Sequence, residues 1–324
     1  MSAPPPVAVS CGEPAGIGPE LAVRAWEASG AARPFFLIGD PAHLPEGTPV
    51  AEIDAPEEAA DAARRALPVL RLPFPAPVRP GRPDPANAAA VIEAIALGVR
   101  LVQGGRARAL CTLPIQKSVL AEGAGFAFPG HTEYLAALAE VDRVAMMLVS
   151  PELRVVPATI HIPLSEVPRA LDAEVLESAI RLTHDGLVTL FGIARPRIAV
   201  AGLNPHAGEA GRIGREEIEW IGPLVERLRA EGLDLSGPRP ADTMFHAAAR
   251  AGYDAAVAMY HDQALIPVKT LDFDRGVNLT LGLPFVRTSP DHGTALDIAG
   301  TGRANPTSTL AALDLAWRLS GGAA

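Results

Sequence analysis

Three histidines of the sequence are placed so that they could bind one divalent metal ion. His161, His206 and His261 each close or closely follow a short apolar run typical of a β-strand. Ligands of open α/β sheets bind beyond the carboxyl ends of the strands, so these imidazoles would lie at one edge. Three protein ligands leave coordination positions open for a substrate oxygen. Each histidine alone could be satisfied by backbone hydrogen bonds, but the shared position favours a catalytic metal site.

A second group of residues has the chemistry of an anion-binding site. Lys269, Asn278 and Arg287 follow the last of these histidines, and each is nine residues from the next along the chain. Such a set of side chains could bind a phosphate or carboxylate group. His131 and Thr132 open an amphipathic helical pattern, with Thr132 expected as the N-cap and the free N–H groups as an anion site. Simple capping and ordinary solvation of the cations are the structural alternatives.

Two aspartates accompany these groups. Asp242 opens a helical pattern, and Asp262 directly follows His261. Either could bind a substrate ammonium group, orient an imidazole or accept a proton, and for Asp242 an N-cap is an equal alternative.

The elements that must position these residues alternate between strands and helices, which predicts an α/β fold with a largely parallel sheet. Strands are expected over residues 7–9, 35–38, 109–113, 144–149, 155–160, 198–201 and 255–259. Helices are expected over residues 20–29, 85–103, 132–139, 176–191, 216–230 and 242–251, with an exposed helix over 55–66. The Pro-rich residues 67–85 are expected to form an extended connector.

Composition limits the possible partners. The formal net charge of -9 over 324 residues argues against general affinity for nucleic acid or an anionic membrane. Cys11 and Cys111 are the only cysteines, which we interpret as core-edge thiols in a reducing compartment. The N-terminus lacks the pattern of a secretory signal, and no apolar run approaches the roughly 20 residues that span a bilayer. We therefore expect a cytoplasmic protein.

Several longer motifs occur together between about Val7 and Thr309. They are GEPAGIGPE at 12–20, PGHTE at 129–133, LNPHAGE at 203–209, PADT at 240–243, YHDQ at 260–263 and GVNLTLGLPF at 276–285. In combination they resemble the PdxA family of 4-hydroxythreonine-4-phosphate dehydrogenases, which belong to pyridoxal phosphate biosynthesis.

The resemblance implies an isocitrate/isopropylmalate dehydrogenase-like fold with two α/β lobes and a central cleft. Residues 1–127 with 282–324 would form the cofactor-binding lobe, and residues 128–281 the lobe for substrate, metal and dimerisation. It also implies a homodimer with the active site at the subunit interface and a zinc, magnesium or cobalt ion at the three histidines. The implied substrate contacts are His131, Thr132, Lys269, Asn278 and Arg287.

Neither Gly-rich segment of the sequence is a G-x-G-x-x-G fingerprint. A nicotinamide site is therefore implied by the resemblance alone. Residues 291–306 are similar to the adenosine-binding loop of the related β-decarboxylating dehydrogenases, which implies NAD or NADP. The implied contacts are His292, Gly293, Thr294, Ala295, Asp297 and Asn305.

The implied reaction is oxidation of 4-phosphooxy-L-threonine at C3, followed by decarboxylation. Asp242, Asp262, Lys269 and a metal-bound water are the candidates for proton transfer. Residues 113–117 and 270–274 differ from the commonest sequence of the family at these positions. Related substrates are therefore alternatives: phosphorylated threonate or erythronate, or an aromatic cis-diol. A metal-dependent lyase or hydrolase without nicotinamide, and a non-catalytic phosphometabolite-binding protein, are the alternatives from other classes.

Overall fold

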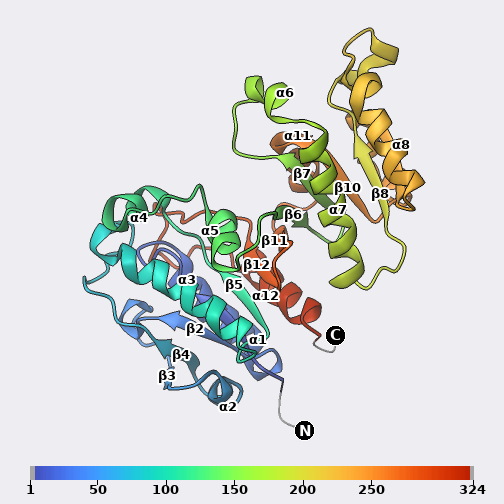
Figure 1. Ribbon diagram of the computed structural model, residues 1–324. Helices are drawn as coiled ribbons and strands as arrows, with labels where there is room; N and C mark the ends of the chain where they lie inside the picture. The colour runs from blue at the N-terminus through green and yellow to red at the C-terminus, as the bar shows by residue number, and fades with distance from the viewer. Residues whose placement is uncertain (1–3, 322–324) are drawn as a thin grey trace. The chain divides into compact units, whose positions relative to one another are not determined.

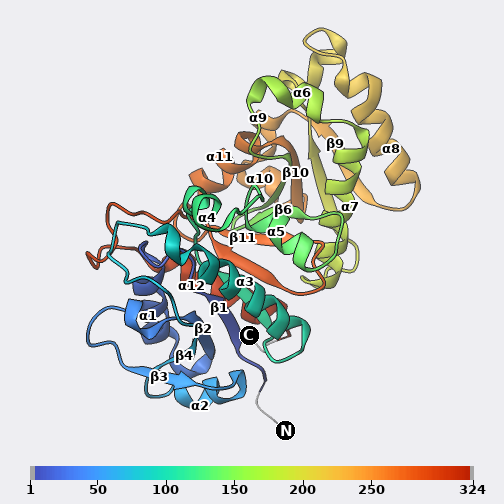
Figure 2. The ribbon, with the colours of Figure 1, turned by 60° about the vertical axis from the view of Figure 1, so that its left-hand side comes forward.

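The computed structural model describes residues 4–321 and divides the chain into two compact units (Figures 1 and 2). Unit 1 comprises Met1–Asp142 and Leu283–Ala324, and unit 2 comprises Arg143–Gly282. The boundary predicted after residue 127 is therefore too early. Residues 128–142 belong to unit 1 because their helix α5 (His131–Leu138) packs on α3 (Ala88–Gln103) of that unit.

Unit 1 contains a parallel sheet whose strand order is β3-β4-β2-β1-β5-β12. Its central strands are almost fully buried, as expected for a parallel sheet that helices cover on its faces. The strands are β1 (Val7–Ser10), β2 (Phe35–Gly39), β3 (Val50–Ile53), β4 (Leu67–Arg71), β5 (Ala109–Thr112) and β12 (Arg287–Pro290).

The helices of unit 1 pack onto this sheet and leave its carboxyl edge to loops. Helix α3 contacts β1, β2 and β5, whereas α12 (Thr307–Leu319) contacts β12 and β5 and packs on α1 (Gly18–Ser29). The other helices are α2 (Ala59–Ala62), α4 (Lys117–Ala124) and α5. Loops that follow β1, β5 and β12 thus emerge from neighbouring parallel strands, which is where α/β proteins bind ligands.

Unit 2 contains a mixed sheet of order β11-β6-β7-β10-β8-β9. Strand β6 pairs antiparallel with both β11 and β7, and the remaining pairs are parallel. The strands are β6 (Ala145–Val149), β7 (Arg154–Thr159), β8 (Arg197–Ala201), β9 (Asp234–Arg239), β10 (Ala255–Tyr260) and β11 (Val277–Leu281).

The core of unit 2 follows from the two-residue period of its strands. Ala256 and Ala258 of β10 join a buried cluster with Ala264 and Val268 of helix α11 (His261–Leu271). Helix α7 (Ala173–Thr189) also packs on β7 and β10. The other helices are α6 (Val167–Ala170), α8 (Gly222–Ala230), α9 (Ala241–Met244) and α10 (Ala247–Arg250). This packing fixes the strand ends that carry the three histidines.

The predicted α/β class with largely parallel sheets is confirmed, but some local predictions are wrong. The Pro-rich connector begins with the buried strand β4, in which Leu67 and Val69 are fully buried. The helix expected over residues 242–251 is divided into α9 and α10, which Phe245 and His246 separate. The exposed helix over residues 55–66 is a short 3-10 turn followed by α2, with buried alanines.

Within the described residues, one helical segment has the length and apolar composition that could cross a membrane. It spans Pro85–Gln103, has a mean hydropathy of 1.5 and is half buried inside the fold. Its Val91, Ile95 and Val99 are buried beside the sheet. Buried core helices of globular proteins can have the same length and apolar composition.

Candidate functional site

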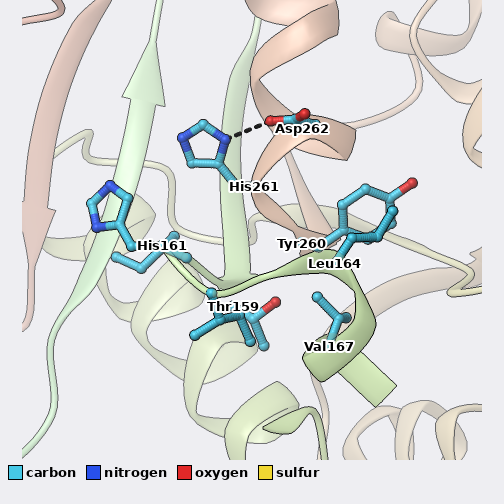
Figure 3. A pocket seen from close by; sticks show the side chains of 9 residues that line it. Thr159, His161, Leu164, Val167, Tyr260, His261 and Asp262 are labelled. Carbon is cyan, nitrogen blue, oxygen red and sulfur yellow. Dashed lines mark hydrogen bonds and ion pairs between the residues drawn. The ribbon is translucent and has the colours of Figure 1, made fainter. Parts of the chain in front are cut away.

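Two of the three predicted metal ligands lie side by side in unit 2. His161 follows β7 and His261 follows β10, and these strands are parallel neighbours in register at Thr159 and Tyr260. The ring centroids of the two histidines are 5.8 Å apart. Both line a pocket of about 290 Å³. Figure 3 shows the two imidazoles in this pocket, which Leu164 also lines. The strand-end argument therefore predicted this pair.

Asp262 fixes the orientation of one imidazole. Its Oδ1 lies 2.7 Å from Nδ1 of His261 (Figure 3). A carboxylate on one ring nitrogen holds the proton there and leaves the other nitrogen as a lone-pair donor, which is the usual arrangement of a metal-binding histidine. Of the three roles considered for Asp262, the geometry favours orienting the imidazole.

His206 follows β8, the other neighbour of β10, but lies in an unusual loop. Residues His206 to Ala210 all have left-handed backbone angles, with φ between 43° and 78°. Only Gly208 among them adopts this conformation without steric cost. A conformation of this kind persists only where the surrounding structure holds it in place.

The buried carboxylate of Glu217 provides that support. Its Oε1 accepts the backbone N–H of Asn204 at 2.7 Å, and its Oε2 accepts the Asn204 side-chain amide at 3.0 Å. A Cβ added to Gly208 would lie 2.6 Å from Oε2, so the loop backbone packs directly on the carboxylate. Glu217 begins a π-helix (Glu217–Ile221), a local irregularity that is frequent near functional sites.

The described residues do not complete a metal site within one chain. Within residues 4–321, no three His, Cys, Asp or Glu side chains are grouped closely enough to hold a metal ion. The paired imidazoles and the Asp262 contact nevertheless match the donor chemistry of a divalent transition metal. The pair could therefore supply two ligands.

Asp242 lies in the short helix α9 and is exposed. The N-cap of this helix is Pro240, so the alternative that Asp242 caps it is wrong. Lys269, on α11, has its Nζ 5.4 Å from the ring centroid of Phe273. Asn278 lies on β11, and its Oδ1 is buried without a hydrogen-bond partner among the described residues. These three predicted residues thus belong to unit 2.

The remaining predicted substrate residues meet in unit 1. Arg287 begins β12, is only 2% exposed and donates from Nη2 to Oγ1 of Thr112 at 2.6 Å. His131 is the first residue of α5, whose N-cap is Gly130, so the predicted N-cap role of Thr132 is wrong. No side chain caps α5, and its first N–H groups remain available to an anion.

Electrostatics in this cluster suit an anion. Burial, together with the charges of Arg287 and Lys117, holds the pKa of His131 well below 6.5, so the imidazole is neutral at pH 7. Burial lowers the pKa of Arg287 to about 10, which leaves the guanidinium charged at pH 7. Nε2 of His131 is buried without a hydrogen-bond partner in the described part of the chain.

Lys117 is a member of this cluster that the sequence analysis missed. It begins α4, and a Cβ added to Gly130 would lie 3.5 Å from its Nζ. In the sequence, the segment 113–117 stood out only because it differs from the commonest sequence of the family. Its position between a strand end and a helix could have marked it as part of the carboxyl edge of the sheet.

The six predicted cofactor contacts all lie in the loop between β12 and α12. Thr294 ties this loop to the rest of unit 1: its carbonyl accepts the N–H of Ile17 at 3.0 Å, and its Oγ1 donates to Oε1 of Gln116 at 3.1 Å. Gly16 is required there, because a Cβ would lie 2.8 Å from the Thr294 carbonyl. The Gly-rich segment 12–20 therefore packs against the predicted cofactor loop.

The other residues of this loop divide between internal contacts and solvent. His292 places Nδ1 3.0 Å from the carbonyl of Gly293, and Oδ1 of Asn305 accepts the N–H of Thr307 at 3.0 Å. Ala295 has a positive φ of 42°, while Gly293 and Asp297 are exposed. Since loops after β1, β5 and β12 meet here, the residues fit a nucleotide site at the sheet edge.

The fold and these clusters define an α/β protein with an anion-binding cluster in one unit and a paired-imidazole site in the other. Residues 31–316 match the family model described as pyridoxal phosphate biosynthetic protein PdxA. A 4-hydroxythreonine-4-phosphate dehydrogenase of Ruegeria sp. (strain TM1040) is 62% identical over 97% of this chain and 96% of its own.

Solved structures agree with this match. The crystal structure of 4-hydroxythreonine-4-phosphate dehydrogenase from Klebsiella pneumoniae has a TM-score of 0.89 and 38% identity, covering 98% of this chain and 99% of that one. A terephthalate 1,2-cis-dihydrodioldehydrogenase from Burkholderia xenovorans LB400 is more distant, with a TM-score of 0.65 and 29% identity over 96% and 97% of the two chains. The chain belongs to the PdxA family, which confirms the predicted family and the prediction of a dehydrogenase in pyridoxal phosphate biosynthesis.

Proposed function

We propose that the protein oxidises 4-phosphooxy-L-threonine at C3 with NAD or NADP. The C3 hydrogen leaves as hydride to the nicotinamide, and the hydroxyl proton passes to a base. The 2-amino-3-oxo-4-phosphooxybutanoate so formed loses carbon dioxide and takes up a proton to give 3-amino-2-oxopropyl phosphate. The observation that carries the choice of a phosphorylated substrate is the cluster of Arg287 and His131 at the first turn of α5.

Each cluster has a part in this reaction. Arg287 and the free N–H groups of α5 bind the anionic substrate, with Thr132 beside them, and Lys269 and Asn278 contribute contacts from unit 2. His161, His206 and His261 would hold a zinc, magnesium or cobalt ion, which would supply Lewis acidity for loss of the hydroxyl proton. Asp262 keeps His261 oriented, so Asp242 and Lys269 are the better candidates for the base.

NAD or NADP is proposed to bind along the loop 291–306. His292, Gly293, Thr294, Ala295, Asp297 and Asn305 are the proposed contacts. The packing of this loop on Ile17 and Gln116 supports a preformed binding surface, since a rigid loop loses little entropy when a ligand binds.

The proposed functional unit is a homodimer, in which a second copy supplies the third histidine. Among the described residues, the large hydrophobic side chains that are exposed all lie in unit 2: Ile162, Leu164, Ile213, Ile218, Ile266 and Phe273. Ile162 and Leu164 line the pocket of His161 and His261, whereas Ile213 belongs to the loop segment after His206. In a two-fold interface the same patches pair reciprocally, so His206 of one copy would join the histidine pair of the other.

The decisive assay uses a panel of substrates with both nicotinamide cofactors. It includes 4-phosphooxy-L-threonine, 4-phosphothreonate, 4-phosphoerythronate and an aromatic cis-diol, and it follows absorbance of the reduced nicotinamide. We expect the highest kcat/KM for 4-phosphooxy-L-threonine, together with release of carbon dioxide. Preference for the unphosphorylated diol would overturn the substrate assignment. Turnover without nicotinamide reduction would instead support a lyase or hydrolase.

The cellular setting is proposed with the function. A small phosphorylated substrate and a nicotinamide cofactor are both found in the cytoplasm, and the net charge of -9 does not favour nucleic acid or anionic membranes as partners. Fractionation of cells that express the full chain would test this, with activity in the membrane pellet as the contrary result.

A further inference from the structure

Lysine is extremely scarce in this chain. Of its 28 lysines and arginines, only Lys117 and Lys269 are lysines. A chain that uses arginine at nearly every basic position retains lysine at two sites, and one of these is a proposed substrate contact. Arginine and lysine are not equivalent where a compact point charge is needed, because the guanidinium group is planar and broader. The other lysine is therefore a candidate for a chemical role.

Lys117 lies where such a role is possible. It is the first residue of α4 and follows the carboxyl end of β5 by a short connection that begins after Thr112. The site where Gly130 lacks a side chain is 3.5 Å from both Nζ and Cε of Lys117, so the ammonium group lies against the first turn of α5. Thr112, at the end of the same strand, accepts a hydrogen bond from Arg287.

The charges around this point leave a net positive site. Arg287 and Lys117 are cations, and His131 is neutral because burial and those two charges depress its pKa. Glu133 is the acidic neighbour, with a carboxylate oxygen 3.4 Å from the Cβ position of Gly130. Burial raises the pKa of the Cys111 thiol to about 11, so that group is neutral as well. Two cations against one carboxylate favour an anionic ligand.

A separate observation indicates that a ligand belongs here. Nε2 of His131 is fully buried and has no hydrogen-bond partner among the described residues. Leaving a buried polar atom unsatisfied is costly, and such atoms in native proteins commonly mark a ligand or water position. The uncapped N–H groups of α5 belong to the same turn as this histidine. The Lys117 ammonium group, the N–H groups of the first turn of α5 and the unpartnered imidazole of His131 thus lie together in unit 1.

We propose that Lys117 is a substrate-binding residue, which contacts the phosphate ester together with Arg287, His131 and the first turn of α5. This inference rests on the proposed function for the identity of the phosphorylated substrate. The phosphate dianion accepts hydrogen bonds from the ammonium group, from Arg287 and from the helix N–H groups. The site binds phosphate and takes no part in hydride transfer.

Substitution of Lys117 separates binding from chemistry. Lys117→Met keeps the aliphatic stem and removes the charge, so we expect KM for 4-phosphooxy-L-threonine to rise at least about tenfold, the effect of losing one charged hydrogen bond. We expect kcat to change much less, because the contact is equally present in the ground and transition states. Lys117→Arg should restore KM only partly, since the broader guanidinium must fit against Gly130.

The matched control is Arg64→Ala, which removes one exposed cation elsewhere in unit 1. It should leave KM unchanged, so that a loss of net charge alone is excluded as the cause. Circular dichroism and thermal unfolding of each variant establish that the fold is retained. An unchanged KM in a folded Lys117→Met enzyme would overturn the proposal.

Binding of inorganic phosphate provides a second test, which does not depend on turnover. We expect phosphate to raise the Tm of the wild-type protein and of Arg64→Ala, but to raise that of Lys117→Met much less, because a ligand stabilises only the state that binds it. An equal rise in all three proteins would overturn the site. If the phosphate effect depends on Lys117 but no phosphorylated hydroxy acid is oxidised, the anion site stands and the proposed reaction fails.

Discussion

The anion cluster of unit 1 and the histidine pair of unit 2 differ in how much of each site one chain supplies. Arg287 is 2% exposed and already bonded to Thr112, and His131 is held by burial in one protonation state. His161 is exposed, and the described residues contain no group of three metal-binding side chains. The residues of the anion cluster come together as unit 1 folds, whereas the histidine pair would need a third ligand to complete the metal site that we propose.

This contrast predicts that substitution of His206 has the largest effect on turnover and metal content. His206→Ala should reduce kcat more than about 100-fold and remove most of the bound metal, because metal affinity falls steeply when a ligand is lost. Metal analysis and turnover assays measure the effect. His184→Ala is the control, because it removes a histidine of unit 2 that is not among the three proposed ligands. Full metal content in His206→Ala would remove this histidine from the site.

Arg287→Ala should act mainly on KM, which tests the preformed cluster. We expect an increase of roughly 10- to 100-fold for the phosphorylated substrate, as for loss of a charged hydrogen bond. Steady-state kinetics with 4-phosphooxy-L-threonine measure it, and thermal unfolding checks that removal of so buried a side chain leaves the fold intact. An unchanged KM would place the phosphate elsewhere.

Glu217→Ala should disturb the loop of His206 and leave unit 1 unaffected. Two hydrogen bonds to Asn204 are lost, which should lower the free energy of unfolding by about 1–3 kcal/mol and reduce metal affinity. Urea unfolding and metal titration measure these changes. Glu219→Ala, which removes an exposed carboxylate paired with Arg215, is the control and should cost less than about 1 kcal/mol. Equal effects of the two variants would contradict the support that we assign to Glu217.

The smallest expected effect is that of His131 on the pH dependence of the free energy of unfolding. Its pKa is lower in the folded than in the unfolded protein, so its contribution to stability is fully present above pH 6.5 and is lost as pH falls below that value. Urea unfolding at pH 5 and 7.5 should therefore show a smaller loss of stability in His131→Gln than in the wild type. The same pH dependence in both proteins would show that His131 titrates normally.

The sequence predicted those features that depend on local pattern. Short apolar runs ending in histidine predicted β7, β8 and β10 and the meeting of His161 with His261. Strands β4 and β9 were missed because proline and polar residues interrupt their apolar pattern. Helix α11 was missed because it starts at His261, directly at the end of a strand.

Other features arise only from the three-dimensional packing. Thr132 looked like an N-cap, but Gly130 takes that position. The roles of Lys117 and Glu217 depend on contacts with Gly130 and Asn204, residues that no periodicity connects to them. The cofactor residues and the units' roles came from family resemblance alone, since residues 291–306 carry no pattern that indicates a nucleotide.

The most direct test of the shared metal site mixes two inactive variants. His161→Ala and His206→Ala are combined, allowed to exchange subunits and assayed for turnover and bound metal. If His206 joins the histidine pair of a second copy, each mixed dimer contains one intact site, and statistical exchange restores roughly a quarter of wild-type activity. If exchange is demonstrated and activity does not return, the three histidines do not form a site shared in this way.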